Sequence, residues 1–447
     1  MSQLTQEKFE ELLRDHKYVE LHHTFSEMNV VDIAQFIEEL PIEQAVVAFR
    51  TLPKETESEV FAEFESETQQ RIIASISDRE IADLIEDTWI DDAVDILEEL
   101  PAPLVKRVLD NASRESRNLI NQYLRYPENS AGSIMTAEFM DLRADMTVAE
   151  AIRHIRSTGH NRETIYTCYV LGREERLDGV VSVRNLLIAN DDEKVEDLMS
   201  SDVIYVTTLS DREDAANTMA KYGLAALPVV DTEEKLVGIV TVDDALDVIM
   251  EETTEDFERM AAMRPSEKPY LKTSITELAR NRFPWLLFLM VSGMLTGWVL
   301  GRYEAIYTAL PILVTFIPML TGTGGNAGSQ SSTMVVRGLA LGELETDDIL
   351  KVIWKEGRVS ILVGLALGAV NFVRLWITYP DSALVPFVVA IAQFGAIVLA
   401  NFVGGVLPII AKTLRIDPAI MSAPLVTTIV DVAVLMLYFF VAGLMLI

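Results

Sequence analysis

The chain has 447 residues, half of them apolar, and a formal net charge of −31 at pH 7. That length predicts several domains rather than one. The charge is uneven, because residues 1–279 hold 27 basic and 59 acidic side chains whereas residues 280–447 hold 10 and 9. The acidic part repels nucleic acid and attracts cations, so we expect no nucleic-acid partner. We predict an acidic soluble part followed by a nearly neutral, apolar membrane part.

The beginning of the chain carries no apolar stretch. Residues 1–20 are polar and mixed in charge, which predicts that no signal peptide is present and that the soluble part stays in the cytoplasm. The single cysteine, Cys168, excludes a disulfide within the chain and fits a reducing compartment.

Residues 1–130 have a helical pattern. Apolar side chains recur at helical spacing, as at Val94, Leu97 and Leu100, with acids between them. Leu-Pro pairs interrupt the pattern at 40–41, 52–53 and 100–101. Because a proline cannot continue a helix, we predict a stack of short helices that forms an all-α superhelical domain.

The next segment changes to strands alternating with helices and contains an internal repeat. Met135 and Met199 stand at matching positions, and the sequence LDGVVSVRNL in the first copy corresponds to LVGIVTVDDAL in the second. This repeat resembles a pair of cystathionine-β-synthase (CBS) motifs, which implies an α/β regulatory module rather than a catalyst. The two motifs cover residues 131–200 and 201–245.

An acid-rich stretch then joins the soluble part to the membrane part. Leu246, Ile249 and Met250 lie on one side of the expected helix, and acids occupy the other side. We predict one long amphipathic helix over residues 243–263, ended by Pro265, and assign residues 246–275 to the linking segment as a whole.

Five apolar segments follow in residues 276–447, each near or above the length that crosses a bilayer core, which predicts a five-helix transmembrane domain. They run over residues 283–300, 305–334, 359–378, 385–411 and 419–447. With the N-terminus inside, nine basic residues flank the inner ends and two flank the outer ends, as the positive-inside rule requires. The inner ones are Lys272, Arg280, Arg282, Arg337, Lys351, Lys355, Arg358, Lys412 and Arg415, and the outer ones are Arg302 and Arg374. An odd number of spans puts the C-terminus outside.

The second span is unusual because Pro311 and Pro318 interrupt it and the sequence TGTGGNAGSQ follows at 321–330. Glycines, amides and hydroxyls at membrane depth are tolerated where helices pack closely or where water lines a cavity. Close packing of small residues is one interpretation. Asn326 and Gln330, four residues apart on one helix face, favour a cavity as the other.

The fifth span contains a carboxylate, Asp431, within an apolar run. A charged side chain there costs about 2.5–3.5 kcal/mol, so it needs a cation, a partner or water. Thr427 lies one turn earlier, beside Thr428, and we expect Pro424 to loosen the helix and free a carbonyl. These hard oxygen donors suit Mg²⁺ or Ca²⁺. The alternative is a protonated Asp431 that only packs helices.

The order of parts resembles the MgtE family of magnesium channels over nearly the whole chain. The matching segments are YPENSAGSIMT at 126–136, GGNAGSQ at 324–330 and DPAIMSAPLVTTIVD at 417–431. The resemblance implies a homodimer in the lipid bilayer, whose pore follows the two-fold axis between the fifth spans. Asp431 of both subunits would bind hydrated Mg²⁺ at the entry, with Thr427, Thr428 and Asn326 beside it.

The resemblance also implies a task for the acidic part. The linking helix would act as a plug, and intracellular Mg²⁺ bound among acidic side chains would hold the channel closed by favouring the compact state. The candidate acids are Glu59, Asp91, Asp95, Asp214, Asp244, Asp247, Glu251, Glu255 and Glu258.

CBS pairs often bind adenosine phosphates through a Gly-x-x-Thr-x-x-Asp turn. Gly238, Thr241 and Asp244 satisfy that spacing, which makes ATP a candidate ligand, whereas the first copy has Asn185 at the acidic position. The alternative is an ordinary turn from a strand to a helix.

Together these patterns predict a Mg²⁺-selective channel for uptake across the bacterial inner membrane, closed by intracellular Mg²⁺. An enzyme is not expected, because the five histidines show no metal-ligand spacing and no Walker loop or nucleophile elbow occurs. The alternatives are a facilitator for Mn²⁺ or Co²⁺, or a membrane-tethered CBS sensor without transport.

Overall fold

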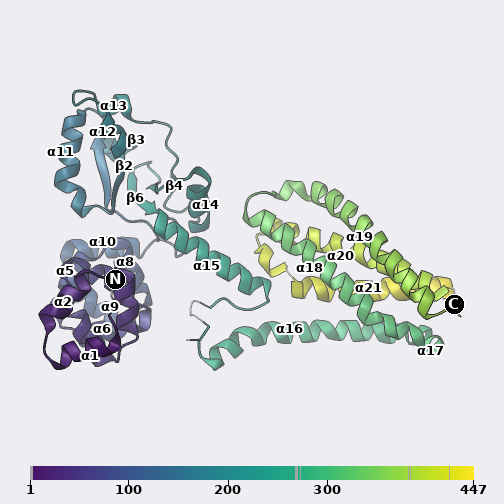
Figure 1. The fold of residues 1–447 in the computed structure, drawn as a ribbon. Coiled ribbons are helices and arrows are strands. Elements are labelled where there is room, and N and C mark those ends of the chain that lie inside the picture. The colour runs from purple at the N-terminus through teal and green to yellow at the C-terminus, as the bar shows by residue number, and fades with distance from the viewer. Residues whose placement is uncertain are drawn as a thin grey trace. The chain divides into compact units, whose positions relative to one another are not determined.

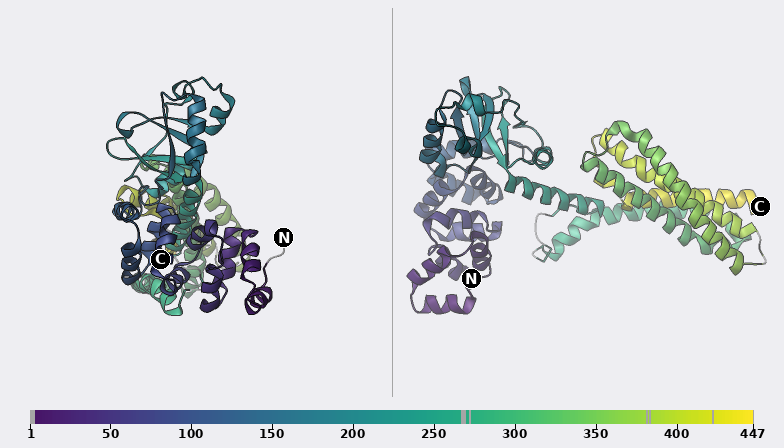
Figure 2. Two further views of the ribbon diagram at one scale, coloured as in Figure 1. Left: turned by 90° about the vertical axis from the view of Figure 1, so that its left-hand side faces the viewer. Right: turned by 45° about the horizontal axis from the view of Figure 1, so that its top comes forward.

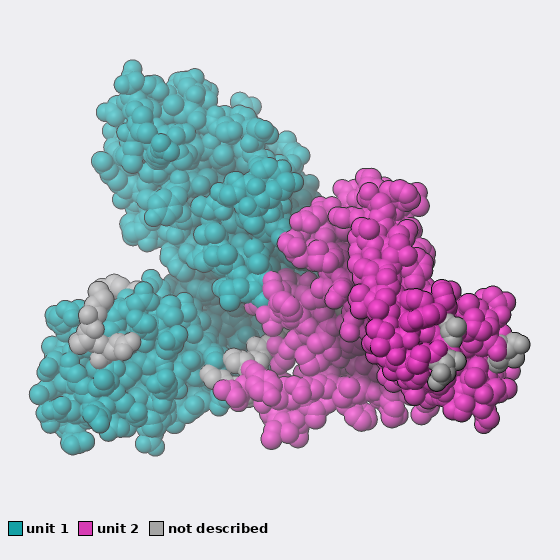
Figure 3. Space-filling view, turned by 45° about the vertical axis from the view of Figure 1, so that its right-hand side comes forward, with its two compact units in different colours: residues 1–250 teal, residues 251–447 magenta. Residues whose placement is uncertain are grey.

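The computed structural model describes residues 4–266, 270–271, 273–380, 382, 384–421 and 423–446. Lys272, which the orientation prediction used, and Ser422, inside the segment 417–431, lie outside the described residues. The chain divides into two compact units, Met1–Met250 and Glu251–Ile447, which Figure 3 shows in different colours. Each unit is described by itself.

Ten short helices make up the first 130 residues, within the described part, and confirm the all-α domain (Figures 1 and 2). They are α1 (Gln6–Arg14), α2 (Tyr18–Ser26), α3 (Val30–Glu38), α4 (Ile42–Phe49), α5 (Lys54–Ala62), α6 (Ser66–Ser75), α7 (Asp78–Asp87), α8 (Ile90–Glu99), α9 (Ala102–Asn111) and α10 (Arg114–Tyr123). The prolines mark helix starts: Pro41, Pro53 and Pro101 are the N-cap residues of α4, α5 and α9.

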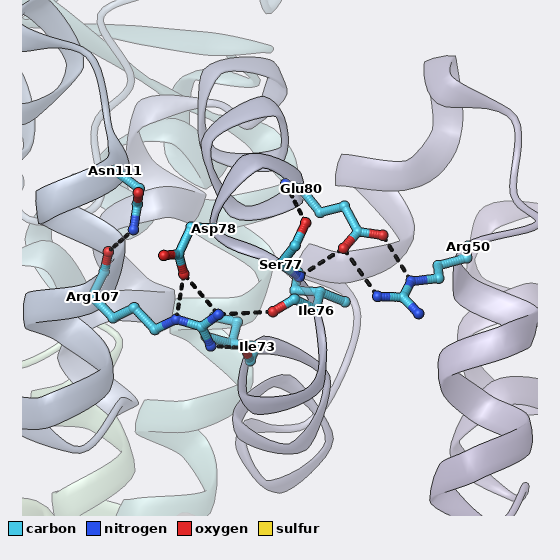
Figure 4. Close-up of polar contacts among 8 residues, drawn as sticks. All are labelled: Arg50, Ile73, Ile76, Ser77, Asp78, Glu80, Arg107 and Asn111. Atoms are coloured by element: carbon cyan, nitrogen blue, oxygen red, sulfur yellow. Dashed lines mark hydrogen bonds and ion pairs between the residues drawn. The ribbon is translucent and has the colours of Figure 1, made fainter.

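Charged contacts fasten neighbouring helices of this stack to one another (Figure 4). Arg50, which ends α4, donates two hydrogen bonds of 2.7 and 3.0 Å to the carboxylate of Glu80 on α7. Arg107 on α9 donates 2.8 Å bonds to the carbonyls of Ile73 and Ile76, at the end of α6. Arg107 therefore satisfies carbonyls at the end of α6, and Arg50 links the end of α4 to a carboxylate of α7.

The CBS pair consists of two three-stranded sheets with the same topology, as the repeat predicts. Within each sheet the first two strands are parallel and the last two antiparallel. The first copy contains β1 (Phe139–Arg143), α11 (Val148–Thr158), η1 (Gly159–Asn161), β2 (Thr164–Leu171), η2 (Arg173–Glu175), β3 (Leu177–Ser182) and α12 (Val183–Ile188). After α13 (Val195–Leu198), the second contains β4 (Val206–Thr207), α14 (Arg212–Tyr222), β5 (Ala226–Val230) and β6 (Leu236–Thr241).

The segment that leads into each CBS copy pairs with the other copy. Thr136, before the first copy, exchanges backbone hydrogen bonds of 2.8 and 2.9 Å with Ile239 on β6. A Cβ on Gly238 would stand 2.8 Å from the sulfur of Met135, and one on Gly179 would stand 2.8 Å from the sulfur of Met199. Both glycines therefore leave room for the methionine that precedes the opposite copy. This explains why the repeat has a glycine and a methionine at matching positions in both copies.

The linking helix, α15 (Val242–Met260), agrees with the predicted helix over 243–263 to within three residues at each end. It begins directly after β6 and ends at Met260, before Pro265, as the proline predicted. Ala262 has a φ of 55°, in the left-handed region that few residues other than glycine adopt. Pro265 follows two residues after Met263, whose backbone N–H bonds back to the carbonyl of Glu258 at 2.9 Å.

The second unit is helical in its described residues, which fits the predicted membrane domain (Figure 1). Its elements are α16 (Ile275–Arg302), α17 (Glu304–Ala309), η3 (Pro311–Phe316), α18 (Ile317–Ala340), η4 (Thr346–Asp348), α19 (Ile349–Thr378), α20 (Leu384–Thr413), η5 (Pro418–Met421) and α21 (Ala423–Leu446). The second predicted span is not one helix from residue 305, because Pro311 starts a 3₁₀ turn and Pro318 lies in the first turn of α18.

Four helical stretches of the described residues are long and apolar enough to cross a membrane: Ile275–Arg302, Thr346–Thr378, Leu384–Thr413 and Pro418–Leu446. The helix α18 is not among them, because glycines, hydroxyls and amides occupy its middle. The prediction of five spans therefore stays a prediction.

Backbones approach closely where α18 packs against α20 and α21. A Cβ on Gly404 of α20 would stand 2.1 Å from the carbonyl oxygen of Gly328 on α18. A Cβ on Gly324 would stand 3.0 Å from Val434 of α21. These glycines therefore support the packing interpretation of the run 321–330.

Candidate metal sites

One group of acids gathers inside the first unit, and we call it the acidic cluster: Asp91, Asp92, Glu163, Asp243 and Asp244. Asp91 and Asp92 lie in the first turn of α8, and Asp243 and Asp244 lie in the first turn of α15. Glu163 immediately precedes β2. Each helix N-terminus presents a partial positive charge, which favours carboxylates there and offsets part of their repulsion.

Burial and mutual repulsion raise the pKa of several members of the acidic cluster. Burial, and then Asp244, raise the pKa of Asp92 to about 6. Burial, and then Asp243 and Asp244, raise the pKa of Glu163 to about 7. Asp91 is only 9 % exposed, and burial followed by Asp92 raises its pKa well above the ordinary value. Charged carboxylates held this way favour a bound cation.

Local hydrogen bonds fix two of these side chains. Asp244 accepts a 2.5 Å hydrogen bond from the hydroxyl of Thr241. The Oδ1 atom of Asp91 accepts the backbone N–H of Asp92 at 3.0 Å. By contrast, the buried Oε2 atom of Glu163 has no hydrogen-bond partner in the described part of the chain. The acidic cluster therefore contains unused oxygen acceptors.

Among the nine predicted regulatory acids, the structure brings Asp91 and Asp244 together in the acidic cluster. Asp247 lies near its edge, where burial and then Asp243 raise its pKa. Four of the remaining predicted acids are exposed side chains outside the acidic cluster: Glu59 on α5, Asp95 on α8, Asp214 on α14 and Glu251 on α15. Within the residues described, no three or more His, Cys, Asp or Glu side chains are arranged to hold a metal ion directly.

The sequence interpretation missed Asp92, Glu163 and Asp243. The doublets Asp91-Asp92 and Asp243-Asp244 were visible as signals, because each stands at a helix start. Nothing in the sequence near Glu163 marks it, since only the packing of the CBS pair against α8 makes it a member of the acidic cluster.

The end of α15 has a different arrangement, which we call the arginine cluster: Arg259, Glu255 and Asp417. Arg259 forms ion pairs with Glu255, one turn earlier, and with Asp417, between α20 and η5. The side chains of Arg259 and Asp417 are 35 % and 24 % exposed. Nearby Glu258 accepts the backbone N–H of Ser266 at 2.7 Å. Two predicted regulatory acids, Glu255 and Glu258, therefore already bind groups of the protein.

Of the candidate pore residues, Thr427 on α21 contacts α18 directly. The hydroxyl oxygen of Thr427 lies 3.3 Å from that of Ser329, which the sequence interpretation did not name. A Cβ on Gly325 would stand 2.9 Å from the Thr427 methyl group, so only glycine allows this approach. Asp431 is half-buried one turn further along α21, and Asn326 is exposed on α18.

One detail of the pore prediction is wrong. Pro424 is the second residue of α21, where a proline interrupts no hydrogen bond of the helix, so it does not loosen the span. Its carbonyl accepts a 2.9 Å hydrogen bond from the hydroxyl of Thr428. Thr428 is therefore turned to the backbone, whereas Thr427 faces α18.

The candidate nucleotide-binding turn runs from a strand to a helix as predicted, but its carboxylate already accepts a hydrogen bond within the protein. Thr241 ends β6 and Asp244 lies in the first turn of α15. The Asp244 carboxylate accepts from Thr241 and lies beside Asp91, so it has little freedom to take ribose hydroxyls as well.

Comparisons with family models define the class of protein. The model of the MgtE intracellular N domain matches residues 28–129, and CBS models match residues 131–192 and 195–251. The model described as a divalent cation transporter matches residues 317–441, which contain both halves of the candidate pore. The chain is thus a multidomain membrane protein of a cation-transporter class.

Comparisons with whole relatives are more specific. The chain is 36% identical over 432 residues to the magnesium transporter MgtE of Thermus thermophilus, covering 95% of each chain. It is 32% identical over 431 residues to the magnesium transporter MgtE of Bacillus subtilis, covering 96% of this chain and 95% of the relative. The chain belongs to the MgtE family of magnesium transporters.

Two solved structures resemble the first unit. A crystal structure of the soluble part of a magnesium transporter has 31% identity and a TM-score of 0.52, and the match covers 55% of this chain and 96% of that one. The cytosolic domain of the Mg²⁺ channel MgtE in complex with ATP has 35% identity and a TM-score of 0.51, covering 54% and 98%.

Proposed function

We propose that this protein is a Mg²⁺ channel in which Asp431 binds the ion on its way through the membrane. The observation that carries the proposal is a half-buried carboxylate in the apolar helix α21, within the segment matched by the divalent cation transporter model. A charge at that position needs a cation or water. We infer transport rather than catalysis as the role of the chain.

We propose that two copies form the pore. Asn326 and Gln330 are exposed on α18, beside the face of α21 that carries Thr427 and Asp431. Hydrocarbon satisfies none of these polar groups, so a second copy with water between the two is the arrangement that supports them. Two facing Asp431 carboxylates would hold Mg²⁺ through its water shell, because that ion sheds water reluctantly.

The test is ion flux in proteoliposomes with the variant Asp431→Asn, which keeps the shape and removes the charge. We expect Mg²⁺ flux to fall about tenfold or more, because a cation pore depends on its acidic ring. Glu343→Gln is the matched control, since Glu343 is an exposed carboxylate in the turn after α18. Wild-type flux through Asp431→Asn would overturn the proposal.

The same assay separates Mg²⁺ from other divalent ions. The relatives are named for magnesium, so neither the Mn²⁺ or Co²⁺ facilitator nor the sensor without transport is favoured. We expect Mg²⁺ to pass in preference to Mn²⁺ and Co²⁺ in a panel at equal concentrations. A larger flux of Mn²⁺ or Co²⁺ would replace the proposed substrate while leaving the pore in place.

We propose that intracellular Mg²⁺ closes the channel by binding at the acidic cluster. Bound Mg²⁺ would remove the repulsion between α8 and the start of α15 and favour the compact first unit, which shifts the population toward the closed state. An ion that keeps several waters needs only one or two direct carboxylates, which suits a cluster without a ready-made cage.

The pair of changes Asp91→Asn and Asp244→Asn tests this regulation in patch recordings. We expect half-closure to need about tenfold more Mg²⁺, which corresponds to a loss of about 1.4 kcal/mol of binding. Glu43→Gln on α4 is the control, because Glu43 is exposed and lies outside the acidic cluster. Unchanged closure in the double variant would remove the acidic cluster from the gating account.

We propose a bacterial inner-membrane location, with the N-terminus in the cytoplasm and the C-terminus outside. The proposal rests on the basic residues at the expected inner ends of the spans and on five spans, α18 included. A phosphatase fused after the last residue, active only outside the cytoplasm, should be active. An inactive fusion would require an even number of spans.

We also propose that ATP binds at the CBS pair. Its support is the resemblance to the cytosolic domain solved with ATP, together with the Gly-x-x-Thr-x-x-Asp turn. Because the Asp244 carboxylate already bonds to Thr241, we expect Asp244→Asn to weaken ATP binding less than tenfold in calorimetry. A complete loss would assign the ribose to Asp244 after all.

A further inference from the structure

A pocket at the start of α16 combines basic and polar side chains. Its volume is about 450 Å³, and its lining residues are Arg264, Thr276, Glu277, Arg280 and Asn281. All five belong to the second unit, and none was among the candidate site residues. Both arginines are exposed, and the lining carries a net charge of +1.

Backbone contacts shape this pocket. The backbone N–H of Arg264 donates to the carbonyl of Asn281 at 3.2 Å, so the segment after α15 lies along the beginning of α16. Pro284 lies inside α16 and has no N–H, so the carbonyl of Arg280 lacks its usual partner within the helix. The two guanidinium groups are therefore carried by segments that the backbone holds together, next to an available carbonyl.

The apolar surface of α16 begins where the pocket ends. Phe283 and Leu286 are 64% and 62% exposed, and Val299 is the buried residue of this helix. Under the membrane placement proposed above, on which this inference rests, lipid tails cover these side chains. The pocket then lies at the level of the phospholipid headgroups on the cytoplasmic side.

We propose that this pocket binds the headgroup of an anionic phospholipid, with the phosphate between Arg264 and Arg280. Guanidinium groups bind phosphate through charge-assisted, often bidentate hydrogen bonds, and Thr276 and Asn281 add neutral donors. The Arg280 carbonyl can accept a hydroxyl group, while the Glu277 carboxylate opposes a further negative charge in the pocket. The headgroup that fits these donors and this acceptor is a phosphate ester bearing hydroxyls, as in phosphatidylglycerol.

Native mass spectrometry of the full chain in detergent tests the proposal by counting bound phosphatidylglycerol against phosphatidylcholine. At about 0.3 M salt, charges more than about 6 Å apart are screened, so contact within the pocket dominates. We expect Arg264→Gln and Arg280→Gln each to weaken phosphatidylglycerol binding about fivefold, the amount typical of one basic residue at a membrane surface.

Arg282→Gln is the matched control, because Arg282 lies two residues along the same helix and is exposed, yet does not line the pocket. We expect it to change binding less than about twofold. An equal loss in Arg282→Gln would mean a diffuse attraction and overturn the pocket. Binding of phosphatidylcholine as tight as that of phosphatidylglycerol would overturn the anionic ligand.

Glycerol phosphate separates the lipid from a soluble phosphate ester. We expect it not to displace the lipid at a hundredfold excess, because it lacks the acyl chains that the exposed face of α16 would contact. Displacement would reassign the pocket to a soluble ligand. Arg280→Lys keeps the positive charge and should therefore retain more phosphatidylglycerol binding than Arg280→Gln. An equal loss of binding in both variants would indicate that replacing Arg280 disturbs the fold. No readout depends on Mg²⁺ flux, so failure here leaves the proposed channel untouched.

Discussion

The two ends of α15 carry acids in opposite electrostatic settings. At its start, Asp243 and Asp244 face Asp92 and Glu163, and the main effects on the pKa of Glu163 come from burial and other acids. At its end, Arg259 pairs with both Glu255 and Asp417. One helix therefore has acids that repel each other at its start and, at its end, an arginine that offsets part of the acid charge. Burial, and then Asp417 and Glu252, still raise the pKa of Asp256 to about 6.

This difference decides where a free cation matters. A ligand stabilises a folded arrangement only by the extent to which it binds that arrangement better than the opened one. At the acidic cluster, a bound Mg²⁺ relieves repulsion that folding creates. At the arginine cluster the guanidinium group already supplies one positive charge, so added Mg²⁺ has less repulsion to remove, namely that of Asp417 and Glu252 on Asp256. The predictions below test this contrast, from the largest expected effect to the smallest.

The largest effect should be Mg²⁺-dependent protection of the acidic cluster. At a concentration of 100 times its Kd, Mg²⁺ should raise the local opening free energy around α8 and the start of α15 by about 2.7 kcal/mol. Hydrogen exchange on the full chain, with and without Mg²⁺, measures it. Peptides from the end of α15 should change much less, and equal protection at both ends would contradict the contrast.

The pair of changes Asp92→Asn and Glu163→Gln provides the matching variant. Both substitutions keep the shape of the side chains and remove charge that Mg²⁺ would otherwise bind. We expect the variant to resist opening without Mg²⁺ and to gain less than about 1 kcal/mol when Mg²⁺ is added. A full response in this variant would move the regulatory ion away from the acidic cluster.

The second prediction removes the fixed cation. Arg259→Gln leaves Glu255 and Asp417 facing each other, and because these side chains are about a third to a quarter exposed, we expect a loss of about 1–2 kcal/mol. Thermal unfolding in detergent measures it. Mg²⁺ should now stabilise this end of α15 and restore part of the loss, whereas wild-type protein shows no such gain.

A double variant checks that the loss arises from the ion pair. Adding Asp417→Asn to Arg259→Gln removes the unpaired carboxylate, so the double variant should be more stable than Arg259→Gln alone. It should also lose the acquired response to Mg²⁺. If the double variant is the sum of the two single losses, the pair is not coupled.

Much of the fold was predictable because it depends on local patterns. The internal repeat predicted two α/β copies, and the Leu-Pro pairs predicted where short helices end and begin. The interruption of the second span at Pro311 was also predictable, since a proline cannot continue a helix, and a 3₁₀ turn begins there. The helix α16 begins at Ile275, before its apolar stretch, because hydropathy marks the lipid-facing part and not the whole helix.

The sites were predictable only in part. Asp91 and Asp244 were found as acids at suggestive positions, and Asp431 as a charge in an apolar run. Glu163 joins the acidic cluster only through tertiary packing. Arg259 and Asp417 are 158 residues apart, so no spacing rule connects them. The sequence shows which residues are acidic. Whether an acid lies beside a cation or beside another acid depends on the fold.

The third prediction concerns pH without Mg²⁺. The pKa is raised to about 7 for Glu163 and to about 6 for Asp92, so the folded unit binds protons that the opened chain releases. Stability is therefore highest below the ordinary pKa of these acids and is lost as pH rises through 6 to 7. With allowance for partial exposure, we expect opening to become easier by about 1 kcal/mol between pH 5 and pH 8.

Hydrogen exchange corrected for intrinsic rates measures this dependence around α8. The variant with Asp92→Asn and Glu163→Gln should show a flat profile over the same range, because the groups that titrate are gone. Saturating Mg²⁺ should flatten the wild-type profile at high pH, since the ion and the protons compete for the same oxygens. A profile that rises with pH would contradict the assignment of both pKa values.

The smallest effect tests whether an acid with its own arginine stays indifferent to Mg²⁺ within the first unit as well. Glu80 is paired with Arg50, whose hydrogen bond holds the pKa of Glu80 down to about 2. Arg50→Gln should cost about 0.5 kcal/mol near pH 7, since the pair is partly exposed. Because a lowered pKa gives stability that is lost as pH falls, the difference from wild type should shrink below about pH 4.

Thermal unfolding of the full chain measures the cost, and the decisive comparison is again with Mg²⁺. Glu80 without Arg50 still accepts the backbone N–H of Ser77 at 2.6 Å and is partly exposed, so we expect it to bind the ion too weakly to matter. We therefore expect no new response to Mg²⁺ from Arg50→Gln, unlike Arg259→Gln, where two carboxylates are left together. A Mg²⁺ response of equal size in both variants would mean that any acid without an arginine partner binds the ion, and that grouping the acids does not strengthen Mg²⁺ binding.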